Sequence, residues 1–337
     1  MSLRAEDYLY LIWCYLALLL GVLGNLYVLH STIKHNAIKM DKMSVWLIQN
    51  ISVTDILHLL FLLVPILVSL HAGKVWILGS EACQVVSQYR YCAVLSNMIL
   101  INILSLNKVL RCRYPLRNLH STRRQRVAVT MVTVVLCATQ PLWRWAWARS
   151  GDLAVSFSEY LCYCWDHETE TTSYLFNRLD LYCAILLQIG PCSALVIMNT
   201  VLIYIAFKHS HTNVNWANVS IVVFVTGVFL ASILPHFVYF LKNRQNWTDS
   251  VELRWTVATT LVSTFSNPII YFLTNPHFRT YTTQFVSNCS RALSFRMSKV
   301  EDGCVNTKQG EFSENSKNNI SGGNRDVTSK GKQQSET

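Results

Sequence analysis

The stretch Ser263–Thr274, STFSNPIIYFLT, lies in an uncharged run, Trp255–Leu273, that is about long enough to cross a lipid bilayer as a helix. Its middle holds two residues that suit a membrane helix poorly. Pro268 removes a backbone donor and kinks a helix, and Asn267 places an amide in hydrocarbon. Tyr271 follows three residues after the proline. The stretch therefore predicts a bent membrane helix with polar groups at its centre.

Six further runs are almost free of charge, and all seven together contain only two charged residues, Asp55 and Arg90. The whole chain is 51% hydrophobic and 14% charged, against roughly 25% charged in soluble domains. Seven such runs between short polar loops predict an all-α membrane protein with seven transmembrane helices. The runs are Leu9–His30, Met43–Leu70, Gln84–Leu106, Val127–Trp143, Leu181–Phe207, Val219–Leu241 and Trp255–Leu273.

The distribution of Lys and Arg predicts the orientation in the membrane. The loops after the first, third and fifth runs carry eleven, the opposite side carries eight, and the C-terminal tail adds nine to the first group. Positive loops stay in the cytoplasm, so we expect a multi-pass plasma-membrane protein with its N-terminus outside and its C-terminus inside. The net charge of +10 is then a property of the cytoplasmic face, and it does not indicate a nucleic-acid partner.

Three regions follow from this layout. Residues 1–7 form a short extracellular N-terminus, 8–290 the membrane domain, and 291–337 a cytoplasmic tail whose Ser, Asn, Lys and Gly content predicts disorder. After the last run, apolar residues recur at helical spacing and predict an amphipathic helix along the inner membrane surface. These residues are Phe278, Tyr281, Phe285 and Leu293. Cys289, at the end of this helix, is a candidate palmitoylation site.

The expected outer loops carry candidate modification sites. Cys83, Cys162 and Cys164 lie on the oxidising side, where they permit one disulfide and leave one cysteine over. Asn246 begins the sequon NWT on the same side and is a candidate glycosylation site.

Several motifs occur in order, each on its expected helix. The chain resembles the rhodopsin-like (class A) G-protein-coupled receptors over about residues 8 to 290. The motifs are Gly24-Asn25, NISVTD ending at Asp55, Cys83 with Cys162 or Cys164 as its disulfide partner, FLASILP with Phe229 and Pro235, and NPIIY from Asn267 to Tyr271 followed by PHF. The resemblance implies a seven-helix bundle with an amphipathic eighth helix, an extracellular ligand and a heterotrimeric G protein as partner.

The resemblance also implies roles for the polar and bent positions. Pro268 bends the last span, Pro235 breaks the sixth, and Tyr271 moves inward on activation; plain helix packing is the other interpretation of the prolines. Four residues fall where the family places a sodium ion that stabilises the resting state: Asp55, Asn97, Ser263 and Asn267. An acid ringed by amides and hydroxyls can also be a satisfied polar core, and this alternative stays open. We expect no other cofactor.

One departure from the family concerns signalling. The inner end of the third span normally reads Asp-Arg-Tyr, whereas this chain has Asn107, Lys108 and Val109. Lys108 carries one ammonium and cannot form the two-pronged contact of an arginine. The acid usually found near the start of the sixth span is also missing, because Asn215 lies about there. We expect G-protein signalling, and the alternative is a decoy or arrestin-biased receptor that couples weakly.

The ligand is expected between the outer halves of the helices. A buried guanidinium at Arg90 needs an anion, which is either a ligand carboxylate or phosphate, or Asp180 within the protein. This favours a peptide with an acidic end, an acidic lipid or another small anion over a monoamine. The residues expected to line this aromatic-rich cavity are Arg90, Tyr91, Asp180, Gln188, His236, Phe237 and Phe240.

Other classes of function fit the sequence less well. No nucleophile–base pair, metal cluster or phosphate-binding loop is visible, so we do not expect an enzyme. A transporter or channel usually has repeated halves and several charged or broken helices at mid-membrane, and Asp55 alone is thin support for one. The expected partners are the ligand, a G protein, arrestin and membrane lipid.

Overall fold

The computed structural model describes residues 5–35, 38, 40–72, 77–114, 123–148, 155–157, 162–164, 189–208, 216–242 and 251–291. Within these ranges the side chains of several residues fall outside the description, among them Cys83, Arg90, Tyr91 and Phe240. The chain forms two compact units, Met1–Tyr281 and Thr282–Thr337. Every labelled helix and strand belongs to the first unit.

Each of the seven apolar runs coincides with a helix, although the run predicted from Leu181 is described only from residue 189. The label α8 denotes the helix of the seventh run, and not the amphipathic eighth helix expected after it. The helices are α1 Ala5–His35, α2 Lys42–His71, α3 Gly79–Arg113, α4 Arg123–Ala148, α6 Gly190–Lys208, α7 Trp216–Lys242 and α8 Val251–Thr274.

Six of these helices, as far as the chain is described, are long and apolar enough to cross a membrane, and α4 is not among them. The side chains of α4 are described only for residues 124–137, a stretch too short to cross a bilayer. The expectation that α4 is a seventh span stays a prediction.

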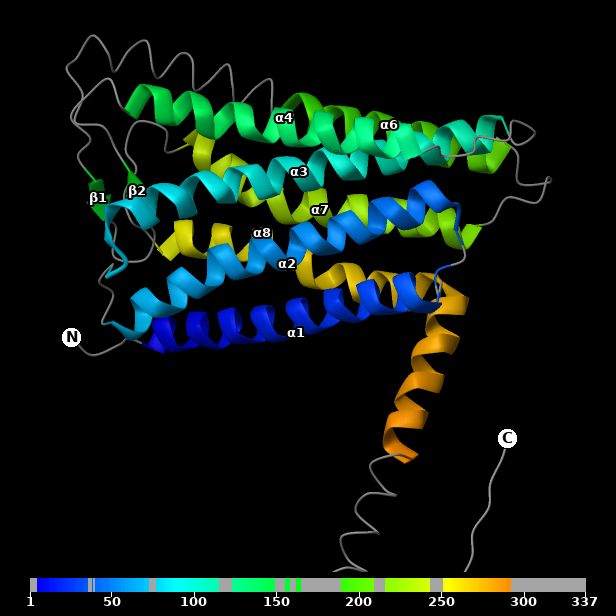
Figure 1. Cartoon of the computed structure of the whole chain (residues 1–337), viewed down its shortest axis with the longest axis horizontal. Coiled ribbons are helices and arrows are strands. Elements are labelled where there is room, and N and C mark those ends of the chain that lie inside the picture. The colour runs from blue at the N-terminus through cyan, green and yellow to red at the C-terminus, as the bar shows by residue number, and fades with distance from the viewer. Residues whose placement is uncertain are drawn as a thin grey trace, which may run out of the picture. The chain divides into compact units, whose positions relative to one another are not determined.

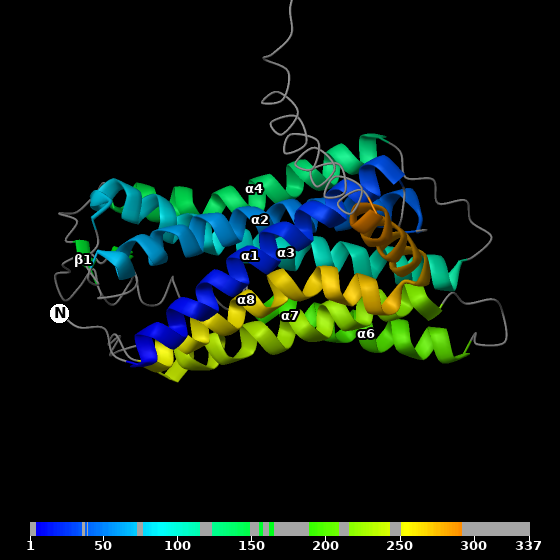
Figure 2. The same cartoon turned by 90° about the horizontal axis from the view of Figure 1, so that it is seen from below.

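The long helices run side by side in a bundle, and α3 packs against α2, α4, α6 and α7 (Figures 1 and 2). Helix α1 packs against α2 and α8. The expected all-α architecture needs one addition. A short antiparallel hairpin, β1 Val155–Phe157 and β2 Cys162–Cys164, pairs Val155 with Cys164 and contacts α3 through β2.

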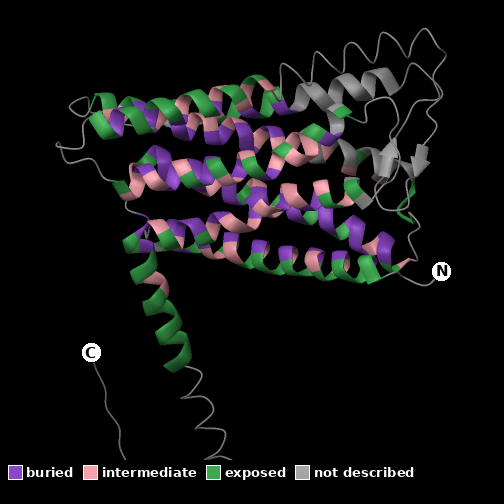
Figure 3. Cartoon of the chain, turned by 180° about the vertical axis from the view of Figure 1, so that it is seen from behind, coloured by how far each residue is buried: buried purple, intermediate pink, exposed green. Residues whose placement is uncertain are grey.

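Burial follows the faces of the helices. Exposed residues line the outer edge of α1, while buried residues face its neighbours (Figure 3). Many exposed side chains are large and apolar, for example Leu9, Leu19 and Leu23 on α1 and Phe224 on α7. Such surface is costly in water and is expected for helices that face lipid.

The proline inside α8 accounts for the contacts that Gly24 and Asn25 of α1 make with it. Pro268 has no N–H, so the carbonyl of Thr264, four residues earlier, lacks its helical donor. Asn25 Nδ2 donates to that carbonyl over 2.7 Å and to the Gly21 carbonyl over 2.9 Å. A Cβ on Gly24 would lie 2.9 Å from Pro268 Cγ. The absence of a side chain at Gly24 therefore lets α1 approach the bent helix closely enough for the amide of Asn25 to replace the missing donor.

A buried ion pair also joins the first turns of α1 and α8. Arg254 donates from Nη1 to Asp7 Oδ1 over 2.9 Å, and the Asp7 side chain is 2% exposed. Helices α1 and α8 are thus joined both at one end and at the kink.

Helical structure resumes after α8 and covers residues 276–291. Asn275 Oδ1 accepts from the backbone N–H of Phe278 over 3.1 Å, and Pro276 occupies the first helical position, as is common at helix starts. Phe278 is buried, and its ring lies 5.7 Å from that of Tyr27. Leu293 and the tail from residue 292 lie outside the described residues, so the amphipathic placement of this helix on the membrane, the domain boundary at 290 and tail disorder stay predictions.

We expect Gly24→Ala to lower the unfolding temperature of the receptor in lipid nanodiscs, because the added Cβ must displace Pro268. Overpacking of this kind costs about 1–3 kcal/mol. Gly227→Ala is the matched control, since a Cβ at Gly227 meets no atom within 4 Å, and replacing a helical glycine there should be neutral or stabilising by up to about 1 kcal/mol. Equal destabilisation by the two substitutions would contradict this account of the contact.

Candidate functional site

A buried carboxylate joins three helices at the centre of the bundle. Asp55 in α2 is fully buried. Its Oδ1 accepts from Asn97 Nδ2 of α3 and its Oδ2 accepts from Asn267 Nδ2 of α8, each over 2.7 Å. A charged side chain at the centre of a bilayer costs about 2.5–3.5 kcal/mol or more, and these two amides supply the hydrogen bonds that offset it. The structure thus brings together three of the four residues predicted for the ion site.

Ser263, the fourth of these residues, is buried, but its hydroxyl donates to the Thr260 carbonyl of its own helix over 3.0 Å. The surroundings are rich in oxygen. Asn97 Oδ1 and the hydroxyls of Ser52 and Tyr271 are buried and accept or donate no hydrogen bond, and Tyr271 lies close enough to Asp55 to interact with it electrostatically. Carboxylate, amide and hydroxyl oxygens are the ligands that hard cations prefer, so the residues present fit a small cation.

A second polar cluster lies where α2 begins and α3 ends. Asp41 is the N-cap of α2, and Oδ2 of its carboxylate accepts from the backbone N–H of Ser44 over 2.9 Å. Lys108 Nζ lies 2.8 Å from Asp41 Oδ1, and Arg111 Nε lies 3.3 Å from Asp41 Oδ2. Asn107 Nδ2 donates to Asp41 Oδ2 and to Ser44 Oγ, both over 2.9 Å. The carboxylate of Asp41 thus gathers donors from both helices.

The residues that replace Asp-Arg-Tyr therefore belong to one constellation. Asn107 and Lys108 both contact Asp41, and Val109 is buried in the adjoining apolar core. The acid that the family usually has near the start of the sixth span is missing here. Lys108 nevertheless has a carboxylate partner, because Asp41 at the start of α2 contacts it. We did not single out Asp41 from the sequence. An acid three residues before Ser44, ahead of a long apolar run, is an N-cap signal that could have drawn attention to it.

Electrostatics support the pairing. Burial raises the pKa of the Asp41 carboxyl, but attraction to the Lys108 ammonium and hydrogen bonds from the neighbouring donors outweigh burial and hold the pKa well below its usual range. Asp41 is therefore ionised throughout the physiological pH range.

Most residues predicted for the ligand cavity lie outside the described part. Asp180 and Gln188 are not described, and for Arg90, Tyr91 and Phe240 only the backbone is. His236 and Phe237 are half-buried on α7. The same limit holds for Asn246 and for the side chains of Cys83, Cys162 and Cys164. Cys289 is an exposed free cysteine.

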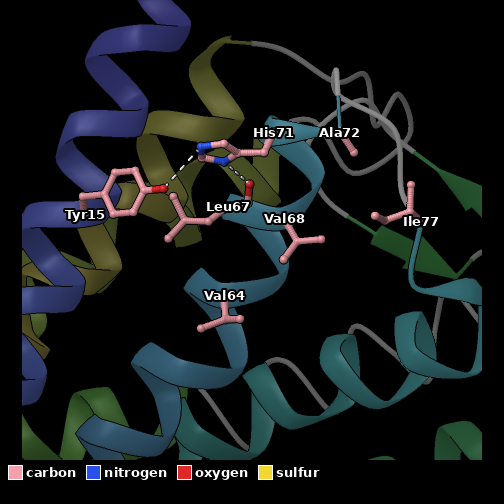
Figure 4. Close-up of a pocket in the computed structure, with 7 residues that line it drawn as sticks. All are labelled: Tyr15, Val64, Leu67, Val68, His71, Ala72 and Ile77. Atoms are coloured by element: carbon pink, nitrogen blue, oxygen red, sulfur yellow. Dashed lines mark hydrogen bonds between the residues drawn. The ribbon is translucent and has the colours of Figure 1, made fainter.

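A different hollow is described between α1 and the end of α2 (Figure 4). It has a volume of about 500 Å³. Its lining residues are Tyr15, Val64, Leu67, Val68, His71, Ala72 and Ile77. None of them was predicted to bind ligand. The Tyr15 hydroxyl lies 3.3 Å from His71 Nε2, and His71 Nδ1 lies 2.8 Å from the Leu67 carbonyl, so the polar groups of this hollow are already satisfied.

A bundle of long apolar helices that surrounds an amide-bound carboxylate and a proline-bent last helix defines a multi-pass membrane protein with a polar core. Residues 24–271 match the family described as 7 transmembrane receptor (rhodopsin family). The match covers well over half of the chain, and the chain belongs to this family.

One curated relative is similar in sequence. It is galanin receptor 2a of Danio rerio, which is 26% identical over 117 residues. The alignment covers 35% of this chain and spans 31% of the relative's length. The family confirms the expected resemblance, and because it is a family of receptors, it confirms the expectation of a receptor in place of an enzyme.

The depressed pKa of Asp41 predicts how its contribution to stability depends on pH. A carboxyl whose pKa is lowered by folding stabilises the protein fully above its unfolded-state pKa, about 4, and loses that contribution as pH falls toward the folded-state value. We therefore expect Asp41→Asn to destabilise the receptor by the same amount at pH 7 and pH 5, about 3 kcal/mol for an unpaired buried cation. The penalty should shrink only below about pH 4.

The measurement is thermal unfolding of both proteins in nanodiscs across this range. Asn is as good an N-cap as Asp, so the substitution isolates the charge. A penalty that is the same at pH 3 as at pH 7 would show that folding does not lower the pKa of Asp41.

Proposed function

We propose that this chain is a plasma-membrane receptor that binds an extracellular ligand and signals to a heterotrimeric G protein. The observation that carries the proposal is the family match over residues 24–271, reinforced by the Asp55–Asn97–Asn267 contact inside the matched region. The excess of Lys and Arg in alternate loops supports a topology in which α4 completes seven spans, with the N-terminus outside and the C-terminus inside.

The ligand that this proposal favours is a peptide, with an acidic lipid or another small anion as the alternative. Two observations support it. Arg90 places a guanidinium in a helix that is otherwise free of charge over Gln84–Leu106, and a buried guanidinium requires an anion. The similar protein from Danio rerio is named as a galanin receptor, although the likeness covers only 35% of this chain.

Sodium at Asp55 is a further part of the proposal. Asp55 and Asn97, with the hydroxyls of Ser263 and Tyr271, would supply its oxygen ligands, and the ion would neutralise the buried carboxylate.

A disulfide from Cys83 to Cys162 or Cys164 is also proposed, and the contact between α3 and β2 supports it. Glycosylation at Asn246, palmitoylation at Cys289, and binding of arrestin and membrane lipid complete the proposal.

One observation favours a second candidate function, a decoy or arrestin-biased receptor with weak G-protein coupling. Lys108 stands where the family has the arginine that contacts the G protein, and here it is 5% exposed and paired with Asp41. A cation held in this way is not available to a partner until the pair opens.

The receptor function predicts a measurable response in cells. We expect recruitment of at least one G-protein class when cells that express the chain are exposed to a library of peptides and acidic lipids, with monoamines as the negative set. Arg90→Gln should weaken the response to anionic ligands by about tenfold or more, the loss expected when one partner of a buried charge pair is removed.

A tag on the N-terminus should be reachable by antibody on intact cells; a tag reachable only after permeabilisation would overturn the topology.

Lys108→Arg separates the two candidate functions. If the chain is a decoy because its ammonium cannot make a forked contact, Lys108→Arg should produce a large gain in second-messenger output at equal surface expression. A wild-type chain that couples well and gains little from the substitution supports ordinary signalling.

Sodium binding predicts a cation-specific stabilisation. In nanodiscs, replacing choline chloride by sodium chloride should raise the unfolding temperature, because a ligand that binds only the folded state stabilises it. Asp55→Asn should abolish the increase. Asp7→Asn is the matched control, since Asp7 is also a buried acid but pairs with Arg254, and it should keep the sodium response. An identical response in Asp55→Asn would place the ion elsewhere.

A further inference from the structure

Asp41 has no counterpart among the motif residues by which the sequence resembles its family, yet it organises the end of α3. Its carboxylate contacts Lys108, Arg111 and Asn107, which occupy adjacent turns of α3. The same carboxylate caps α2 through Ser44. We propose that Asp41 is a positioning residue for coupling, which holds Lys108 against α2 in the resting receptor and releases it when a cytoplasmic partner binds. We name the Asp41–Lys108 pair the latch. The inference rests on the proposed function.

The distribution of acids makes Asp41 the only candidate for this role at its end of the bundle. Apart from Asp41, the acids in the described residues are Glu6, Asp7, Asp55, Glu81 and Glu252. Glu6, Asp7 and Glu252 lie in the first turns of α1 and α8, Glu81 lies at the start of α3, and Asp55 lies midway along α2. The connections 36–40, 115–122 and 209–215 contain no acid in their sequence. Within the described residues and these three connections, no other carboxylate lies at this end to hold Lys108.

The contact of α3 with α7 is of a different kind. The first turns of α7, Trp216–Val222, contain no charged residue. Val219 and Val222 of α7 belong to the same buried apolar cluster as Leu104 and Val109 of α3. Movement of the first turns of α7 away from α3 therefore breaks apolar packing and, among the described side chains, no ion pair. The charge-based control in this receptor lies between α2 and α3.

The exposure of Arg111 gives the latch a means of release. Both Lys108 and Arg111 contact the carboxylate of Asp41. Lys108 is buried, whereas the Arg111 side chain is 29% exposed. A partner that presents an acidic side chain or a terminal carboxylate at this face gains a contact with Arg111 first and can then compete with Asp41 for Lys108. The partner chemistry that fits is an acidic segment of a cytoplasmic protein.

The test uses substitutions that separate the charge of Asp41 from its capping role. Asp41→Asn and Asp41→Ser both keep a good N-cap but remove the charge, whereas Asp41→Glu keeps the charge. At equal surface expression, we expect the two neutral variants to raise ligand-independent G-protein recruitment by about fivefold or more, the usual size of one coupling interaction. Asp41→Glu should stay within about twofold of the wild type.

A second measurement does not depend on the G protein. A bimane fluorophore on Trp216→Cys reports on α7, which contributes no residue to the latch. Cys289→Ser removes the exposed thiol of the described residues, and Cys304→Ser removes the cysteine of the tail. In nanodiscs without ligand or partner, Asp41→Asn and Lys108→Met should shift the emission in the same direction. The charge-reversed pair Asp41→Lys with Lys108→Asp should return it to the wild-type value. If Asp41→Asn fails to reach the membrane, Lys108→Met and the reversed pair decide.

The outcomes separate the latch from the receptor function. An emission that is unchanged in both Asp41→Asn and Lys108→Met overturns the latch, whether or not the chain couples. An emission shift that the reversed pair cancels supports the latch, even if neither the wild type nor any variant recruits a G protein, and in that case the proposed coupling fails while the latch stands. Equal recruitment by Asp41→Asn and a coupling-competent wild type also overturns it.

Discussion

The proline in the last helix is the constraint on which the arrangement of the bundle depends. Pro268 leaves a backbone carbonyl without its donor in a setting where water cannot supply one. Asn25 supplies it from α1, and Gly24 lets α1 come close enough to do so. One turn of α8 then presents Asn267 to Asp55, which brings α2 and α3 into the same centre. Pro268 and Asn267, the partner of the buried acid, are therefore adjacent in the same turn of α8.

Several amides in this core bond to partners on other helices. Asn102 of α3 donates to the Pro191 carbonyl of α6 over 3.2 Å, and Asn199 of α6 donates to Ser105 of α3 over 3.4 Å. Without water, such hydrogen bonds and close packing replace the hydrophobic effect as the source of helix association. The central position of α3 follows, since its amides bond to both α2 and α6.

The sequence predicted the helices well because a membrane span imposes a simple requirement of length and polarity. Charge-free runs located the described ends of the seven helices to within about one turn or two, and whether α4 spans the membrane stays a prediction, because the side chains of its second half lie outside the description. The partnership of Asp55 with Asn97 and Asn267 was also predicted, from the family resemblance. Ser263 is buried, but its hydroxyl bonds to its own helix, which spacing along a helix cannot distinguish from a bond across it. Asp41 was missed for a physical reason. A search for charges inside the spans passes over Asp41, which lies just before a span. The end of α3 lies beside the start of α2, so residues at these two helix ends can contact each other. The hairpin was missed as well, because two strands of three residues give no periodic signal.

The two connections between α1 and α8 have a mechanical meaning. The Asp7–Arg254 pair fastens their first turns, and Asn25 fastens the turn just before Pro268. The part of α8 before the proline is therefore held against α1 at two points. Beyond the proline the contact with α1 is apolar, because Phe278 is buried and its ring lies 5.7 Å from that of Tyr27. A change of angle at Pro268 would therefore strain apolar packing on one side of the proline and polar contacts on the other.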